Sequence, residues 1–446
     1  MTKSLTALAL ALLVGWASGQ YVLDSINAGG MGSLVFNEAA RVVYGTDDYF
    51  GLVAISTDSN KVISRVPADG AILVAYSVTS AKAYCSFGHS FSESLLVVDG
   101  HTHQRLRALY LLEAKMSLWD PDSDRLYVAC GDENEVTVLS CRNDSVLTRI
   151  HVGQYPIRLV LNRRHRRVYS LNDDDESVSI IDMDGFSVVR TIPLGSAPES
   201  GWYSPVSDRL YVGGTFEVVV IDGARDSLRL RLPILGESGL SMCGCLGDSL
   251  LAVGADGDAA SHIRVLDAFR DSFVHEMPTG RMVLSVAWSP TSALLYCVSG
   301  HDDNLTVVGD RVSRVVTTLA VSDGPDAAVV TPGRVYVGHI NSPWVYVIRD
   351  TCSGIAEDHL SGRVCALLEA RPNPFVSSVL IRCLPEAGRD APLRIYAQTG
   401  VLVRTLAGGG SWHWDGRDDH GRPVPAGVYV LRSTGEAGAL LVVKSE

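Results

Sequence analysis

Short apolar runs alternate with polar turns along most of the chain, and this alternation repeats. Residues 124–140 (DRLYVACGDENEVTVLS) contain an apolar run, an acidic turn and a second apolar run, which predicts a β-hairpin. Residues 166–182 (RRVYSLNDDDESVSIID) give nearly the same pattern 42 residues later. The strand signal recurs at intervals of 40 to 45 residues, at Tyr44, Tyr84, Tyr127, Tyr169, Tyr211, Leu251, Tyr296 and Tyr336. A period of this length indicates a repeat architecture.

Each repeat unit has the same order of four expected strands. In one unit, residues 157–162 (IRLVLN) precede the tyrosine strand, and residues 177–182 (SVSIID) and 187–192 (SVVRTI) follow it. Four strands in roughly 40 residues are typical of a β-propeller blade. The eight units predict an all-β propeller of eight blades, and a count of seven stays open if the irregular Leu251 unit packs differently.

The last unit lacks a clear fourth strand, and the start of the chain can supply one. Residues 21–26 (YVLDSI) match the fourth strand of other units, such as residues 145–150 (SVLTRI). We therefore expect residues 21–26 to complete the last blade and close the ring, because a propeller leaves no long sheet edge unpaired.

The first 19 residues have the pattern of a secretory signal peptide. Lys3 precedes an apolar stretch at residues 5–16, and Ala17 and Gly19 are small residues at the −3 and −1 positions of a cleavage site before Gln20. No later segment has 18 consecutive apolar residues, so no membrane span is expected in the mature chain. These features predict a secreted, extracellular or cell-surface protein.

Charge and cysteine content narrow the expected partners and chemistry. The formal net charge of −12 argues against nucleic acid as a partner, since nucleic-acid binding needs a basic surface. Nine cysteines are present without a CxxC pair or zinc-type spacing, and most are expected to be small buried residues. Cys243 and Cys245 are expected on one face of the same strand, which is a poor geometry for a disulfide.

The repeat period stops after residue 362, and a different module follows. Residues 363–446 contain six or seven short expected strands, the size of a small Ig-like β-sandwich. The sequence thus predicts three segments: a signal peptide at 1–19, a β-propeller at 20–362 and a C-terminal sandwich at 363–446.

The repeat units resemble the YVTN type of β-propeller repeat. The segments RLYVACGDENEVTVLS and RVYSLNDDDESVSIID match its pattern of a Tyr-Val strand, a turn with Asn or Asp and a V-x-V-I-D strand. The resemblance covers about residues 21–362. It implies the propeller fold and a bacterial or archaeal surface or periplasmic location, and it assigns no activity.

The tail resembles two related modules: the Ig-like domain of flagellar hook-capping proteins and the C-terminal sorting domain of type IX secretion cargo. The resemblance implies an export signal or a surface-attachment module, with secretion or cell-envelope machinery as the partner, and both options stay open. The residues themselves indicate tight turns at the glycines and a core around the aromatic side chains. The matching residues are Pro372, Asn373, Pro374, Phe375, Tyr396, Gly400, Trp414, Gly416, Asp418, Gly421, Gly427, Val428 and Tyr429.

Polar turns from all units should meet on one face of the ring, here called the top face. This face carries the loops between second and third strands and the loops between blades. It supplies the candidate ligand-binding residues, which are Asp47, His89, Asp132, Asp173, Asp256, Arg281, His301, Asp302 and His339. Solvated turns, a polar ligand site and a metal site formed by His301 and His339 are the three interpretations.

Familiar catalytic signatures are missing from the sequence. It contains neither a GxSxG elbow nor a P-loop, and no catalytic residue or cofactor is predicted. The expected function is a binding module for a protein, a glycan or a small polar ligand, with an export or anchoring tail. The alternative is a propeller hydrolase or lyase, acting on lactones or glycans through the acidic, histidine-bearing top face.

Overall fold

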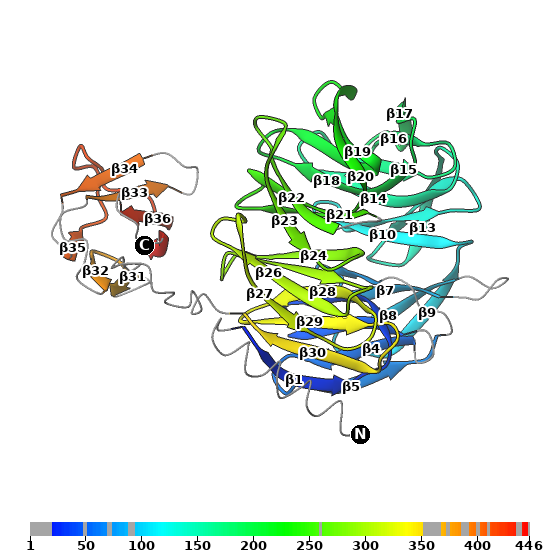
Figure 1. Cartoon of the computed structure of the whole chain (residues 1–446), viewed down its shortest axis with the longest axis horizontal. Coiled ribbons are helices and arrows are strands. Elements are labelled where there is room, and N and C mark those ends of the chain that lie inside the picture. Colours follow the sequence, from blue (N-terminus) through cyan, green and yellow to red (C-terminus); the bar gives the residue numbers. More distant parts are fainter. Residues whose placement is uncertain are drawn as a thin grey trace. The chain divides into compact units, whose positions relative to one another are not determined.

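The computed structural model shows an all-β protein (Figure 1). It describes residues 20–47, 51–68, 74–87, 94–257, 261–350, 367–371, 375–384, 392–397, 402–407, 411–433 and 439–444. The predicted signal peptide, His89, Gly400 and residues 372–374 lie outside this description. The chain divides into two compact units, residues 1–356 and 357–446. No described helix is long and apolar enough to cross a membrane.

The first unit is a β-propeller of eight antiparallel four-stranded blades, which confirms the expected fold and the larger blade count. Blade 1 contains β2 (Met31–Asn37), β3 (Val42–Asp47), β4 (Gly51–Ser56) and β5 (Lys61–Val66). Blade 2 contains β6 (Val74–Ser77), β7 (Lys82–Phe87), β8 (Ser94–Asp99) and β9 (Arg105–Tyr110). Blade 3 contains β10 (Ala114–Asp120), β11 (Arg125–Cys130), β12 (Glu135–Ser140) and β13 (Ser145–His151). Blade 4 contains β14 (Pro156–Asn162), β15 (Arg167–Asn172), β16 (Ser177–Asp182) and β17 (Ser187–Pro193).

Blades 5 and 6 share one six-stranded sheet because two of its strands are unusually long. The sheet contains β18 (Pro198–Ser204), β19 (Arg209–Asp222), β20 (Ser227–Cys245), β21 (Leu250–Gly257), β22 (Ser261–Asp267) and β23 (Ser272–Thr279). β19 spans two strand positions of blade 5, and β20 runs from the outer strand of blade 5 into the inner strand of blade 6. The irregular Leu251 unit is therefore a complete blade, with Leu251 buried at the tyrosine position.

The N-terminal strand closes the ring. Blade 7 contains β24 (Val283–Ser289), β25 (Leu294–Ser299), β26 (Asn304–Gly309) and β27 (Arg314–Ala320). Blade 8 contains β28 (Pro325–Thr331), β29 (Arg334–His339), β30 (Trp344–Arg349) and β1 (Val22–Asn27). β1 pairs with β30 from Val22 opposite Ile348 to Asn27 opposite Trp344, which confirms the expected closure. The first strands of neighbouring blades contact one another around the ring, including β28 with β2.

The repeat tyrosines form the core between blades. All seven have no exposed surface. In five blades the hydroxyl also reaches the next blade: in four of them the turn between its third and fourth strands, and for Tyr296 the residue directly after β30. Tyr84 donates to Asp144 Oδ1 at 2.9 Å, Tyr211 to Asp271 Oδ1 at 3.1 Å, Tyr296 to Asp350 Oδ1 at 2.8 Å and Tyr336 to Asn60 Oδ1 at 2.8 Å, and Tyr44 is 2.8 Å from His103 Nδ1. The recurring tyrosine thus packs one blade and bonds to its neighbour.

The described cysteines of the propeller are small core residues, as expected from the sequence. Cys85, Cys130, Cys141, Cys243, Cys245 and Cys297 are all free and buried. Burial raises the pKa of Cys85 to about 12, so this thiol stays protonated at neutral pH. The Sγ atoms of Cys243 and Cys245 lie 4.0 Å apart on one face of β20.

The second unit consists of two packed sheets of seven described strands. One contains β31 (Leu367–Arg371), β32 (Val379–Leu384) and β35 (Ser411–Trp414); the other contains β33 (Leu393–Ala397), β34 (Leu402–Leu406), β36 (Gly427–Ser433) and β37 (Ala439–Lys444). The ring centroid of Trp414 lies 5.3 Å from that of Phe375 and 5.0 Å from that of Tyr429, so these residues form the core. Gly416 and Gly421 have positive φ, and Asp418 accepts the backbone N–H groups of His420 and Arg422, as tight turns require.

Candidate functional site

The first strands of blades 3 to 7 enclose a cavity of about 470 Å³ in the central channel. Its walls come from β10, β14, β18, β20 and β24, and most of the lining side chains are apolar, including Met116, Trp202 and Met242. The indole Nε1 of Trp202 donates to Asp248 at 3.2 Å, which holds the ring in place. A cavity of this size and character falls within the range of small-molecule sites.

A β-bulge recurs near the start of the first strands; it directly follows the first paired residue in all of them except β20, where it follows Gly239. It is present in β2, β10, β14, β18, β20, β24 and β28. A bulge removes one residue from the ladder and redirects its side chain, and bulges are common beside functional sites. The bulged residues are Gly32, Lys115, Ile157, Glu199, Leu240, Leu284 and Asp326.

The residue after the bulge links neighbouring blades. Ser200 Oγ donates to the carbonyl of Gly239 at 2.7 Å, and Ser241 Oγ donates to the carbonyl of Val283 at 2.9 Å. Ser285 Oγ accepts the N–H of Ala328 at 3.3 Å. A short hydroxyl side chain therefore suffices for this contact in blades 5, 6 and 7.

Blade 4 has Arg158 at the same position. Its Nε donates to the carbonyl of Glu199 at 3.2 Å, so it also links two blades. Arg158 also lines the cavity and is solvent-exposed, and no hydrogen bond or ion pair joins its Nη atoms to any described residue. Loss of hydration lowers the pKa of Arg158, although the charges of Glu199 and Asp326 oppose this effect.

Glu199 and Asp326 are bulged residues of β18 and β28, at the level of Arg158 in the ring. Burial raises the pKa of both carboxyl groups, that of Asp326 to about 6, while the charge of Arg158 acts in the opposite direction. Repulsion from Asp173 adds to the effect at Glu199. Glu199 and Asp326 are half-buried, and carboxyl groups with a raised pKa near a cation are a common property of functional sites.

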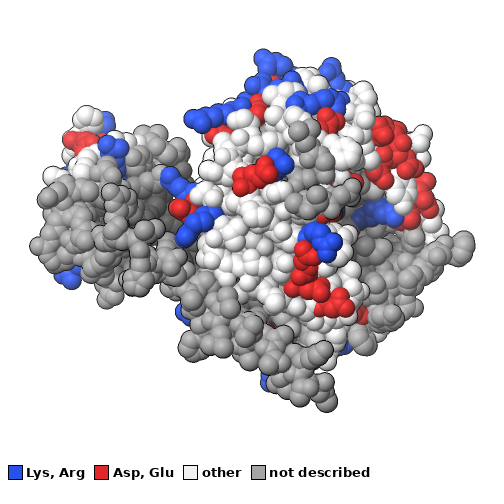
Figure 2. All heavy atoms as spheres, viewed as in Figure 1, with Lys and Arg blue, Asp and Glu red and all other residues white. Residues whose placement is uncertain are grey.

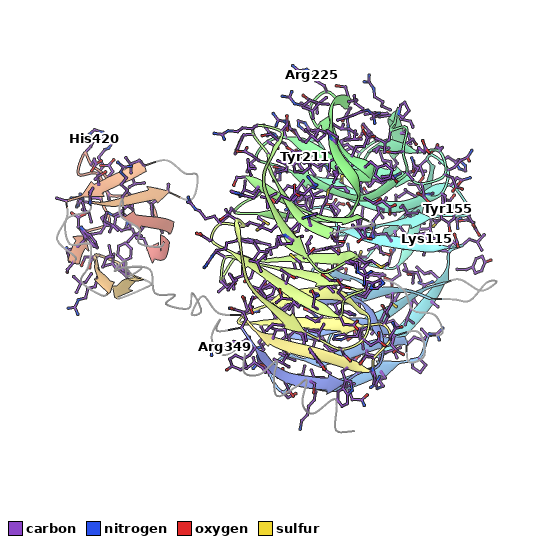
Figure 3. The ribbon with its side chains drawn as sticks, in the orientation of Figure 1. Lys115, Tyr155, Tyr211, Arg225, Arg349 and His420 are labelled. Carbon is purple, nitrogen blue, oxygen red and sulfur yellow. The ribbon has the colours of Figure 1, made fainter. Side chains whose placement is uncertain are left out.

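A second cationic side chain, Lys115, occupies the bulge of β10 in blade 3. Lys115 Nζ forms an ion pair with Glu113 at 2.9 Å and lies 4.8 Å from the ring centroid of Tyr155 (Figure 3). Tyr155 in turn donates to Glu113 at 3.4 Å. Lys115 is therefore neutralised within its own surroundings, in contrast to Arg158.

The candidate residues of the top-face loops have different surroundings. Arg281 forms an ion pair with Asp302 at 2.9 Å, and these bonds hold the pKa of Asp302 below its usual range. His301 is exposed beside Asp302, with Nδ1 3.4 Å from the carboxylate. Asp256 accepts the Met282 N–H at 2.7 Å and the Ser261 hydroxyl at 2.6 Å, as a turn residue does.

The other described candidates from the top-face loops differ in how exposed their side chains are. Asp47 is buried at the end of β3, and Asp132 is exposed in its turn. Asp173 is the one described candidate whose charge acts on the Arg158 group, through Glu199. Figure 2 shows acidic side chains gathered on one side of the propeller, over the elements coloured cyan to teal in Figure 1.

His339 does not offer a free ring nitrogen for a metal. Its Nδ1 donates to the carbonyl of Trp344 at 2.6 Å, and its Nε2 accepts the N–H of Ser322 at 3.3 Å. In the described part of the chain, the one group of potential metal ligands within reach of one another is Cys130, Glu133 and Glu135. Arg149 bonds to both glutamates, at 3.3 and 3.0 Å, so a cation already balances their charge.

The sequence did not identify Arg158, Glu199, Asp326 or Trp202 as candidate site residues, because the expected site lay in the loops and these residues lie on first strands. The useful signal was the alignment of first strands. At the bulge of the first strand and at the position after it, most blades carry apolar residues, glycine or serine. Blade 4 carries Arg158 there, blade 5 carries Glu199 and blade 8 carries Asp326.

Comparison with known proteins gives the fold without a family. No protein-family model matches the chain, and no curated protein matches it. Among solved structures, the chain is similar to a chain of Kuenenia stuttgartiensis hydrazine synthase, with 16% identity, a TM-score of 0.51, and coverage of 62% of this chain and 94% of that one. It is also similar to a chain of a mitotic checkpoint complex, with 16% identity, a TM-score of 0.53, and coverage of 63% and 86%. Both support the propeller fold.

Proposed function

We propose that this protein is an exported β-propeller that binds a ligand in its central channel, with a C-terminal module for export or attachment. The observation that supports binding is the cavity of about 470 Å³, whose wall is mostly apolar and carries the exposed, cationic side chain of Arg158. A mostly apolar cavity of this size with a few polar groups in its wall is the usual form of a small-molecule site. Propellers also commonly serve as binding modules, although the fold alone assigns no ligand.

The export part of the proposal rests on the sequence. The pattern of residues 1–19 supports secretion, and the YVTN-like repeats support a surface or periplasmic location. The tail motif, with Phe375, Trp414 and Tyr429 in its core, supports a sorting or attachment role. Expression of the full chain and of a chain without residues 1–19, followed by fractionation, tests this part; equal retention of both in the cytoplasm contradicts it.

A second candidate function is a hydrolase or lyase. It is favoured by the carboxyl group of Asp326, whose pKa of about 6 suits a general acid or base near neutral pH. The binding and enzymatic proposals differ in one measurement: turnover of lactone and glycan substrates by the wild type and by Asp326→Asn. Turnover that Asp326→Asn abolishes would establish an enzyme.

The binding proposal is tested by a thermal-shift screen of the chain from Gln20 with peptides, glycans and small organic acids and bases. We expect at least one ligand to raise Tm, as selective binding to the folded state requires. We also expect substitution of Met242 by Trp, which fills the cavity, to abolish that shift. A shift that survives Met242→Trp would contradict a site in the channel.

A further inference from the structure

The polar side chains in the cavity wall lie at one level of the ring, here called the polar level. In blades 4 to 7 the residue directly after the bulge lines the cavity, and it pairs with the same position of the second strand in each blade. Because the first strands begin at the top face, the polar level lies towards the top end of the cavity. Its residues are Arg158, Ser200, Ser241 and Ser285.

The polar level has hydrogen-bond donors available for a ligand. Ser200 and Ser241 already donate their single hydroxyl hydrogen to carbonyl groups of the next blade. Arg158 uses its Nε for the contact between blades, and its Nη atoms have no partner among the described residues. Ser285 accepts an N–H group of blade 8, which leaves its hydroxyl hydrogen free to donate. A ligand group that accepts hydrogen bonds and donates none matches this level.

The charge of the cavity wall has one sign. Among the described residues that line the cavity, Arg158 is the only charged one. Glu199 and Asp326 occupy bulges, one residue nearer the top face than the polar level, and neither of them lines the cavity. A wall with one cationic group attracts an anionic group, and a single negative charge on the ligand is enough to balance it.

The wall beyond the polar level is apolar. Leu118, Val160 and Trp202 lie further along β10, β14 and β18 than the polar level, and all three line the cavity. The indole N–H of Trp202 is used by Asp248, so the ring offers the ligand its apolar surface. Burial of methylene or aromatic groups against such a wall favours binding. A ligand that fills the cavity therefore has an apolar body on one side of its charged group.

We propose that the cavity binds a monocarboxylate with an apolar body, of the class of a medium-chain fatty acid or an aryl-substituted alkanoic acid. Its carboxylate accepts hydrogen bonds from the Nη atoms of Arg158, and its apolar body extends past Trp202, away from the top face. A carboxylate suits this position because its two oxygen atoms match the planar fork of a guanidinium group. This inference rests on the proposed binding function and specifies its ligand class.

Calorimetric titration of the chain from Gln20 with matched probes tests the proposal. Octanoate and 4-phenylbutanoate carry the carboxylate on an aliphatic or an aromatic body, octylammonium carries a cation instead, 1-octanol carries no charge, and acetate has no apolar body. We expect at least one of the two larger carboxylates to bind, and the other three probes to bind about tenfold more weakly or less. Octylammonium or 1-octanol binding as tightly as the carboxylates would contradict the role of the charge.

Two further probes define the headgroup and the body. Octyl phosphate carries close to two negative charges and should bind more weakly than octanoate; tighter binding would point to a phosphate ligand and overturn the carboxylate. Octanoate should bind more tightly than hexanoate by about threefold for each added methylene, because each methylene is buried against the apolar wall. Equal affinities of octanoate and hexanoate would show that the body lies outside the cavity.

Variants of Arg158 separate a contact with the carboxylate from a general effect on the cavity. Arg158→Ser should lower the affinity for octanoate about tenfold and leave that for 1-octanol unchanged, because only octanoate loses a charge-assisted hydrogen bond. Arg158→Gln, which keeps an N–H donor for the contact between blades, gives the same comparison if the serine variant does not fold. Arg163→Ser removes an exposed arginine from the turn after β14 and is the matched control, which should bind like the wild type.

Two results would overturn the inference: neither carboxylate binds at millimolar concentration, or a folded variant without the Arg158 charge binds octanoate and 1-octanol in the same ratio as the wild type. If the thermal-shift screen then gives a ligand of another class that Met242→Trp displaces, the carboxylate inference fails and the binding function stands. If no ligand is displaced, the binding function fails as well.

Discussion

At the scale of single residues, His339 shows how burial decides chemistry. It ends β29 on the top face, where the sequence suggests an accessible histidine, yet its ring has no exposed surface. The ring packs against Tyr346 with centroids 5.0 Å apart, and both nitrogens are hydrogen-bonded, one to Trp344 of blade 8 and one to Ser322 in the loop before it. Burial lowers the pKa of His339 to about 4, so the side chain is neutral at pH 7.

This predicts a specific loss of stability in acid. An unfolded histidine has a pKa of about 6.5, so between pH 6.5 and 4 the unfolded chain binds a proton that the folded chain refuses. Stability from this group is therefore present above pH 6.5 and is lost as the pH falls towards 4. The free energy of unfolding should drop by roughly 2–3 kcal/mol between pH 7.5 and pH 4.5 on account of His339.

Urea unfolding of the wild type and of His339→Gln at these two pH values measures the effect. The variant should be less stable than the wild type at pH 7.5, and the difference should shrink at pH 4.5. A difference that stays constant would show that His339 does not remain neutral in the fold. Comparing the two proteins at each pH removes the contribution of other titrating groups, such as Asp326.

At the scale of structural elements, the repeat signature explains how blades are joined. In two blades, the basic residue two positions before the repeat tyrosine contacts the same carboxylate of the next blade as the tyrosine hydroxyl does. Lys82 Nζ lies 2.8 Å from Asp144 Oδ1, beside Tyr84, and Arg209 pairs with Asp271, beside Tyr211. The sequence pattern of a basic residue, any residue and tyrosine thus marks a strand and also supplies the side chains that join it to the next blade.

We therefore predict that Asp144→Ala strongly destabilises the propeller. The substitution leaves the buried Tyr84 hydroxyl and the ammonium group of Lys82 without their carboxylate, which should cost about 2–4 kcal/mol. Denaturant unfolding measures this cost. Asp132→Ala, in an exposed turn at the other end of the same blade, is the control and should change stability by less than about 0.5 kcal/mol. Equal effects of the two substitutions would contradict the connector.

The basic turn at residues 163–167 belongs to the same scale. Its side chains pair with acids of both neighbouring blades. Arg163 binds Asp122 of blade 3, and His165 Nε2 lies 2.8 Å from Asp208 of blade 5. Such partners are 41 and 43 residues apart, so each pair spans one repeat.

The sequence predicted elements better than contacts, for a physical reason. Strand, turn and blade boundaries depend on local alternation of residues, which the repeats show eight times over. Asp144, the hydrogen-bond partner of Tyr84, lies 60 residues away along the chain. The direction of the Arg158 side chain depends on a β-bulge, and a bulge cannot be recognised from the alternation of apolar and polar residues. The site therefore had to be read from the structure, although the tail core at Trp414 and Tyr429 was expected from residue type.

At the scale of the propeller, stability depends on closing the ring with a strand from the other end of the chain. β1 supplies the outer strand of blade 8, and Ile26 is buried there. Arg349 N donates to Tyr21 O at 3.0 Å, so the start of β1 lies directly beside the end of β30. Without β1, the backbone groups of β30 would form an open sheet edge of the kind that pairs with other molecules.

Deletion of residues 20–27 is accordingly expected to lower Tm by roughly 10 °C, on the scale of a few kcal/mol for a domain of this size. It should also produce oligomers in size-exclusion chromatography, because the edge of β30 is then available for pairing. The matched control inserts residues 20–27 after Asp350 through a short turn, so that β30 and the displaced strand form an ordinary hairpin. This rearranged chain should regain the elution volume of the wild type and most of the lost Tm, since the blade needs the strand and not its original position in the sequence. A deletion variant with unchanged Tm, or a rearranged chain no more stable than the deletion, would mean that β1 contributes little to the closed ring.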